Sequence, residues 1–139
     1  MKTPKNRFRS TERLVVDAKR LESYLGSFHG SETIYKIPLL GTFYTEGIKY
    51  LAEAAECFWL VTDVSVIAKG LKDRSPFITI AIRIISGKEK ESIGYGAIIR
   101  YSDGNDHILE TQKYHLADFP MERLRLYFVN DTLLLPGEY

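Results

Sequence analysis

The first part of the chain carries apolar residues at helical spacing. They recur at intervals of three or four residues, which places them on one face of a helix; they are Leu14, Ala18, Leu21 and Leu25. Ser10 or Thr11 is suited to cap the start of this helix, and Gly26 follows its end. We therefore predict a first helix from about Thr11 to Leu25.

A second predicted helix has a clearer start. Thr45 is a suitable N-cap, and Glu46 favours the positive end of the helix dipole. Six apolar side chains then share one helical face, which we expect to be core: Ile48, Leu51, Ala52, Ala55, Phe58 and Trp59. Farther on, a Thr-Asp pair is suited to cap a third helical segment, Val64 to Lys69, although the β-branched residues of Val61 to Ile67 also fit a strand.

From residue 77 on, the pattern changes to the two-residue period of strands. Alternating isoleucines from Ile78 to Ile84 line one face of the first strand. The other face carries Phe77, Thr79, Ala81 and Arg83. Further alternating segments predict strands over residues 93–101, 108–114 and 124–128, and an Asn-Asp turn at 130–131 returns the chain through 132–135. Residues 33–37, which stop at Pro38, favour a short edge strand.

Helices followed by a run of strands are typical of an α+β fold. We predict two to three N-terminal helices packed on one face of an antiparallel sheet of four to five strands. Residues 1–10 lack apolar periodicity and are predicted to form a mobile basic arm, and residues 11–139 to form a single domain.

Composition agrees with one globular domain. The chain has 139 residues, of which 45% are hydrophobic and 27% charged, and this excludes disordered and coiled-coil classes. Its single cysteine, Cys57, lies in an apolar stretch and is expected to be a protonated, inert core thiol, as suits a reducing compartment. No signal-peptide or membrane-spanning pattern occurs, so we expect a cytoplasmic protein.

The net charge of +1 conceals a basic N-terminus. Residues 1–20 hold seven Lys or Arg and two Asp or Glu, a balance of +5, so the rest of the chain sums to −4. A mobile cationic arm supplies phosphate contacts that do not depend on base sequence. One hypothesis is therefore nucleic-acid binding by the arm residues Lys2, Lys5, Arg7, Arg9 and Arg13.

Catalytic and metal-binding patterns are weak. Glu53 follows Lys49 by four residues, as on a solvated helix face, and Glu46 suits a helix terminus. The histidines His29, His107 and His115 lack the short spacing of a zinc site. We expect no cofactor and no metal, and we do not favour an enzyme. An unrecognised active site would have to join at least two of Glu46, Glu53 and these histidines in one pocket.

Aromatic residues cluster around the second helix, and protein interfaces are enriched in Tyr and Trp. Tyr44 and Tyr50 fall outside the apolar helical face, so we expect both to be partly exposed. Together with the carboxylates of Glu46 and Glu53, they form our predicted partner-binding set.

Several segments carry a resemblance to a known family: Tyr44 to Ala55 with Phe58-Trp59-Leu60, Asp118-Phe119-Pro120, Leu126 to Asp131, and Leu134 to Tyr139. The chain resembles, from about residue 21 to 139, a domain family of unknown function whose members occur in bacterial, plasmid and phage genomes. Glu46 stands where the family pattern has Asp, and both carboxylates suit a helix N-terminus.

The resemblance implies a small protein of mobile elements without a known activity. From that context we expect a non-enzymatic protein-interaction domain that binds a host protein, such as a component of a defence system. Nucleic-acid binding by the basic arm and an unrecognised enzyme are the alternatives. We also expect a homo-oligomer, because the C-terminal hairpin and the segment around Ile34 can each leave a strand edge exposed for pairing with a second copy of the chain.

Overall fold

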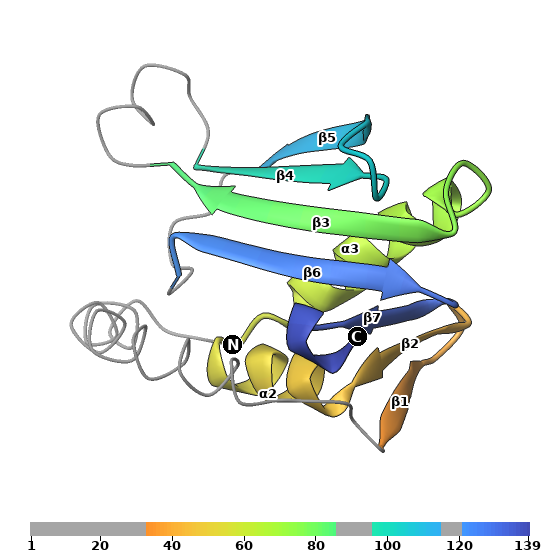
Figure 1. The fold of residues 1–139 in the computed structure, drawn as a ribbon. Helices are drawn as coiled ribbons and strands as arrows, with labels where there is room; N and C mark the ends of the chain where they lie inside the picture. Colours follow the sequence, from red (N-terminus) through yellow and green to blue (C-terminus); the bar gives the residue numbers. More distant parts are fainter. Residues whose placement is uncertain (1–32, 86–95, 115–120) are drawn as a thin grey trace.

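The computed structural model describes residues 33–85, 96–114 and 121–139, which form a mixed α+β fold (Figure 1). Seven strands are hydrogen-bonded in the order β1-β2-β7-β6-β3-β4-β5. Their bounds are Ile34–Ile37 (β1), Thr42–Thr45 (β2), Phe77–Ile84 (β3), Ala97–Ser102 (β4), Ile108–Tyr114 (β5), Arg123–Val129 (β6) and Thr132–Leu134 (β7). Neighbouring strands are antiparallel except β2 and β7, which are parallel.

Two helices, α2 (Glu46–Ala54) and α3 (Phe58–Leu71), pack on one face of this sheet. Figure 1 shows α3 behind β3 and β6, so this helix covers one face of these two strands. The predicted isoleucine face of β3 points toward the helices: Ile78 and Ile80 are completely buried. They join Ile48, Leu51 and Val64 in a single hydrophobic core.

The start of α2 confirms the predicted cap. The Thr45 hydroxyl accepts a hydrogen bond from the Ile48 backbone N–H at 3.4 Å, and Glu46 occupies the first turn. The end of α2 was not predicted. Glu56 adopts a left-handed conformation (φ 52°), and the Cys57 N–H bonds back to the Ala52 carbonyl at 2.9 Å. This is a Schellman motif, which usually places glycine at the position of Glu56.

The break at Glu56 corrects three helical predictions. Phe58 and Trp59 do not continue the core face of α2; they begin α3 and are 42% and 41% exposed. The Thr-Asp pair at 62–63 lies inside α3 instead of capping a later helix, and the alternative strand over 61–67 is wrong. The first predicted helix and the basic arm lie outside the described residues.

The strand predictions are confirmed in position where the structure describes the chain, and residues 93–95 of the predicted strand over 93–101 lie outside the described residues. Strands β3, β4 and β5 form the expected meander, within the described residues, and β1 is an edge strand. The additional strand β2 was not predicted, and the sheet has seven strands instead of four to five. Strand β7 lies between β6 and β2, so the C-terminal hairpin offers no free edge for a second copy of the chain.

The last residues of the chain close over the start of α2. A short 3₁₀ helix, η1 (Pro136–Glu138), buries the Glu138 carboxylate beside the α2 N-terminus. One oxygen, Oε1, accepts from the Thr45 hydroxyl at 2.6 Å and from the Leu135 N–H at 2.9 Å. The other, Oε2, accepts from the Gly47 N–H at 3.1 Å. The first and the last of the family-like segments therefore meet in one buried contact.

Cys57 behaves as predicted. Its side chain is 1% exposed, and burial raises the pKa of the thiol to about 12, so the thiol is protonated at neutral pH. No helix among the described residues has the length and apolar character needed to cross a membrane.

Candidate functional site

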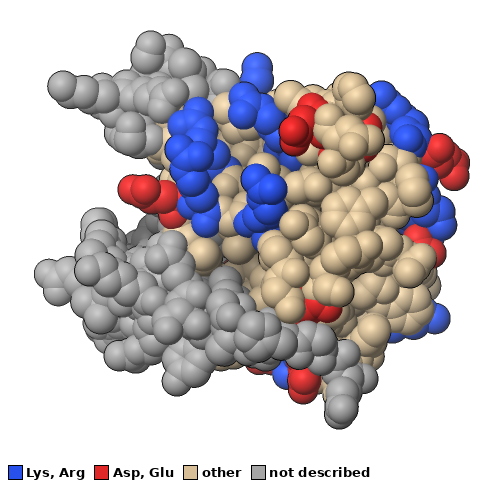
Figure 2. All heavy atoms as spheres, in the orientation of Figure 1, with Lys and Arg blue, Asp and Glu red and all other residues tan. Residues whose placement is uncertain are grey.

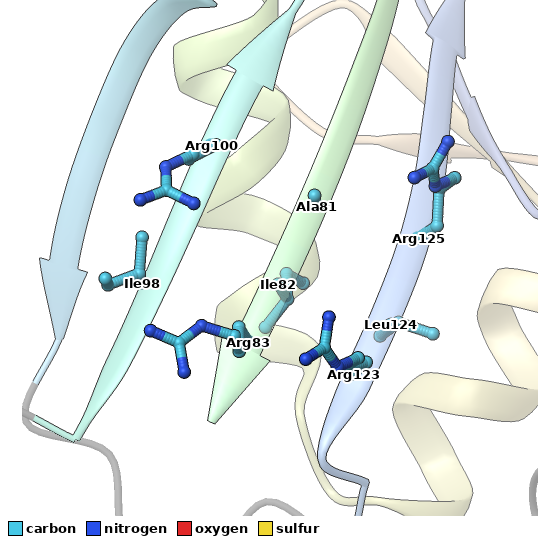
Figure 3. A pocket seen from close by; sticks show the side chains of 8 residues that line it. All are labelled: Ala81, Ile82, Arg83, Ile98, Arg100, Arg123, Leu124 and Arg125. Carbon is cyan, nitrogen blue, oxygen red and sulfur yellow. The ribbon is translucent and has the colours of Figure 1, made fainter. Parts of the chain in front are cut away.

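Four arginines gather on the sheet face opposite α2 and α3, the two helices that the structure describes. Arg83 belongs to β3, Arg100 to β4, and Arg123 and Arg125 to β6. Figure 3 shows their side chains around a common space near the end of β3 and the beginning of β6. In the space-filling view, Lys and Arg side chains gather over the same strands (Figure 2). We call these four residues the arginine cluster.

The sheet register explains why they meet. Arg83 pairs with Arg123 across β3 and β6, and directly paired residues project from the same face. Two residues earlier on β3, Ala81 pairs with Arg100 on one side and with Arg125 on the other. Neighbouring strands lie about 4.8 Å apart, so Arg100 and Arg125 are separated by about 10 Å across Ala81.

A shallow depression lies between the arginines, with a volume of about 310 Å³. The small side chain of Ala81 leaves this space open between Arg100 and Arg125, and Ile98 lines it beside Arg83. None of the eight lining residues is acidic: Ala81, Ile82, Arg83, Ile98, Arg100, Arg123, Leu124 and Arg125.

Placing positive charges opposite each other costs stability, because like charges at paired sheet positions repel. Arg100, Arg123 and Arg125 are exposed, and they make no hydrogen bond or ion pair with another residue in the part of the chain that the structure describes. A guanidinium group keeps its charge at any physiological pH and offers a planar set of donors that matches phosphate and carboxylate. The exposed guanidinium groups of Arg100, Arg123 and Arg125 therefore have the charge and the donors that an anion requires.

An aromatic cluster lies on the same strands, beyond the arginines. Phe77 of β3 and Tyr127 of β6 have ring centroids 4.8 Å apart. The C-terminal Tyr139 contacts both rings edge to face, at 5.1 Å from Phe77 and 5.8 Å from Tyr127. Phe77 and Tyr127 are half-buried, whereas Tyr139 is 71% exposed.

The predicted partner-binding residues lie on the opposite side of the sheet, around α2. Tyr44 and Tyr50 are half-buried, as expected, and both pack against the core. Tyr44 also stacks on the Tyr35 ring at 5.4 Å. Glu46 is exposed in the first turn of α2, and Glu53 forms an ion pair with Lys49 at 3.1 Å. Their role as a partner-binding set stays a prediction.

The residues considered for catalysis are separated in the fold. His107 lies in the loop between β4 and β5, where its Nδ1 is 3.0 Å from Asp103 Oδ2. This loop joins the two strands at one edge of the sheet, β4 and β5. Helix α2, with Glu46 and Glu53, contacts β1, β2 and β7 toward the other edge. His29 and His115 lie outside the described residues. Within residues 33–85, 96–114 and 121–139, no group of three or more His, Cys, Asp or Glu side chains could hold a metal ion.

Sequence reasoning placed Arg83 on the polar face of its strand but did not assemble the arginine cluster. The available signal was the two-residue period: Arg83, Arg100, Arg123 and Arg125 each alternate with apolar core residues. The strand order was missing. Only the pairing of β6 with β3 brings Arg123 and Arg125 beside Arg83, about 40 residues earlier in the chain.

Comparisons with known proteins identify a family and no activity. Neither the curated proteins nor the solved structures include a match to this chain. One family matches residues 19–139, which is most of the chain and includes every strand and helix described above. The chain therefore belongs to DUF6876, a family of unknown function.

Proposed function

We propose that this protein binds nucleic acid through the arginine cluster. The observation that supports the proposal is the convergence of four arginines from three adjacent strands around one depression that has no acidic lining residue. Guanidinium groups are suited to phosphate-rich partners, since each phosphate accepts paired hydrogen bonds.

The shape of the site favours a polymer over a small anion. The arginines are spread over the sheet: the cluster extends about 10 Å across the strands and about 7 Å along them. Exposed charge pairs are individually weak, because water and salt screen them. A chain of phosphates that contacts several arginines at once sums these weak contacts and releases counterions, which provides most of the affinity.

The proposal uses residues that differ from those of the sequence-based hypothesis. That hypothesis assigned nucleic-acid binding to Lys2, Lys5, Arg7, Arg9 and Arg13, which lie outside the described residues. The arginine cluster belongs to the folded sheet, so strand pairing fixes the backbone positions of the four arginines relative to one another. A contribution of the arm is a separate prediction, tested by deleting residues 1–10.

The test is binding to labelled oligonucleotides of about 16 nucleotides, measured by fluorescence anisotropy between about 50 and 200 mM salt. Each single-strand phosphate contact adds about 0.7 to the slope of log affinity against log salt, so the three exposed arginines, Arg100, Arg123 and Arg125, give about 2.1. The Arg100→Gln/Arg125→Gln variant should lower the slope by about 1.4 and weaken binding.

A matched variant separates the cluster from net charge. Lys49→Gln/Lys72→Gln removes the same two charges from the helix side, where Lys49 and Lys72 each form an exposed ion pair. It should bind like the wild type. Equal weakening by both double variants, or no salt-dependent binding by the wild type, would refute the proposal. Salt-sensitive binding of an acidic protein in place of nucleic acid would also refute it.

Protein binding is a second candidate function, favoured by the exposed aromatic residues at the start of α3. Phe58, 42% exposed, contacts the Tyr44 ring edge to face at 5.7 Å, and Trp59 is 41% exposed. Large exposed aromatic residues are typical of interface hot spots. This candidate predicts that a nuclease-resistant host protein is captured by the wild type and by the arginine variants. The same protein should be lost with Phe58→Ser.

A further inference from the structure

We infer that the nucleic acid bound by this protein is single-stranded, and that one of its bases stacks on Tyr139. The inference rests on the proposed nucleic-acid function and adds the form of the ligand. It is carried by the aromatic cluster of Phe77, Tyr127 and Tyr139, which continues the arginine cluster along the same face of the sheet.

Strand β6 links the two clusters. Arg123, Arg125 and Tyr127 alternate with the buried residues Leu124 and Leu126, so all three project from the face opposite α2 and α3. Steps of two residues along a strand are about 7 Å, which places Tyr127 about 13 Å from Arg123. A ligand that follows β6 therefore meets two guanidinium groups and then aromatic rings.

Tyr139 is the ring that is open to a ligand. Phe77 and Tyr127 are half-buried and pack against each other, and Tyr139 rests on both through edge contacts with interplanar angles of 76° and 88°. This support restrains its side chain, while 71% of the residue remains exposed to solvent. A large, restrained and exposed aromatic ring is the type of surface on which a nucleotide base stacks.

This arrangement selects between the two forms of nucleic acid. In a duplex the bases stack on each other, and a flat protein surface reaches mainly the phosphates. In a single strand the faces of the bases are available, and proteins combine basic side chains for the backbone with aromatic side chains for the bases. Arginines and Tyr139 on one open sheet face provide both contacts.

The experiment compares four probes of equal length at equal salt: single-stranded DNA, single-stranded RNA, a DNA duplex, and an abasic oligonucleotide that keeps the phosphates. We expect DNA or RNA single strands to bind more tightly than the duplex and the abasic probe. Tyr139→Ala should weaken single-strand binding by about 5- to 150-fold, the range for one stacked base, without changing the salt slope. Tyr139→Phe should retain binding, because it keeps the ring.

A tryptophan at position 139 tests stacking by its fluorescence and keeps a large aromatic side chain there. This second variant is needed because Tyr139→Ala could also perturb the neighbouring Glu138. Tyr139→Trp in a Trp59→Phe background leaves one tryptophan, since Trp59 is the only one in the chain. Single strands should quench its emission, and the duplex and abasic probe should not. Equal binding of all four probes, or no quenching on binding, would overturn the inference and leave the proposed function intact. Failure of every probe to bind would instead refute the proposed function.

Discussion

The buried Glu138 carboxylate is predicted to hold the end of the chain to the start of α2. It accepts hydrogen bonds from three groups on two segments of the chain: the Thr45 hydroxyl, the Gly47 N–H and the Leu135 N–H. The Gly47 N–H lies in the first turn of α2, where no backbone carbonyl is available as a partner. The carboxylate therefore satisfies donors that the helix and the loop leave open, and its negative charge lies at the positive end of the helix dipole.

The magnitude follows from those three donors. Glu138→Ala removes their acceptor, and a buried donor left without a partner costs about 1 to 3 kcal/mol. We use the lower figure for each, because water can enter the space that the carboxylate vacates, and expect a loss of about 3 kcal/mol in the free energy of unfolding. For a chain of this size that corresponds to a fall of about 10 °C in the melting temperature.

Urea unfolding followed by circular dichroism at fixed pH measures this loss. Glu138→Gln keeps the shape of the side chain but sets an amide donor against at least one of the donors, so it should also destabilise the protein. The control is Glu53→Gln, which removes an exposed carboxylate from α2. It should change stability by less than about 0.5 kcal/mol. Wild-type stability of Glu138→Ala would show that the reasoning is wrong.

Other predictions concern backbone geometry, the buried thiol and the arginine cluster. Gly47→Ala should destabilise the protein by about 1 to 3 kcal/mol, because an added Cβ would lie 2.6 Å from a Leu135 methyl carbon; urea unfolding checks this. Glu56→Gly should stabilise it by about 1 kcal/mol in the same assay, since glycine adopts the left-handed conformation without strain. Burial raises the Cys57 pKa from 9.0 to about 12, so the thiol ionises at lower pH in the unfolded chain than in the folded one. The contribution of the buried thiol to stability is complete below pH 9 and is lost as pH rises toward 12. Stability should therefore fall with rising pH less steeply in Cys57→Ala than in the wild type, as urea unfolding at several pH values would show. The Cys57 thiol should react with a thiol reagent only after unfolding. Arg100→Gln/Arg125→Gln should unfold at or above the wild-type urea midpoint, because it relieves like-charge repulsion on the sheet.

The family-like segments have a structural explanation in this fold. Thr45 and Gly47 belong to the motif at the start of α2, and Leu135 and Glu138 belong to the C-terminal segment. Gly47 is required because the C-terminal segment approaches its Cα too closely for a side chain, with Glu138 Oε1 only 2.7 Å from the position of a Cβ. The segments that carry the resemblance therefore include both sides of this buried contact.

Local sequence determined those features whose physical cause lies within a few residues. The alternation of β3, the Thr45 cap and the Asn-Asp turn before β7 depend on side-chain period, a cap hydroxyl and residues that accept positive φ. These predictions are confirmed. The end of α2 was missed because Glu56 occupies a position where glycine is the usual signal, and the helical spacing continues through Phe58.

The tertiary structure decided which segments meet. Strand order follows from how the buried faces of distant segments pack together, and no local pattern records it. Pairing of β6 with β3 assembled the arginine cluster, and insertion of β7 between β6 and β2 brought Glu138 to the start of α2. The sequence by itself therefore determined the start of α2 and the faces of the long strands, but not β2 or the end of α2. The candidate site depends on long-range strand pairing, which places the arginines side by side. Local sequence does not predict this pairing, because the pairing depends on the free energy of the whole core.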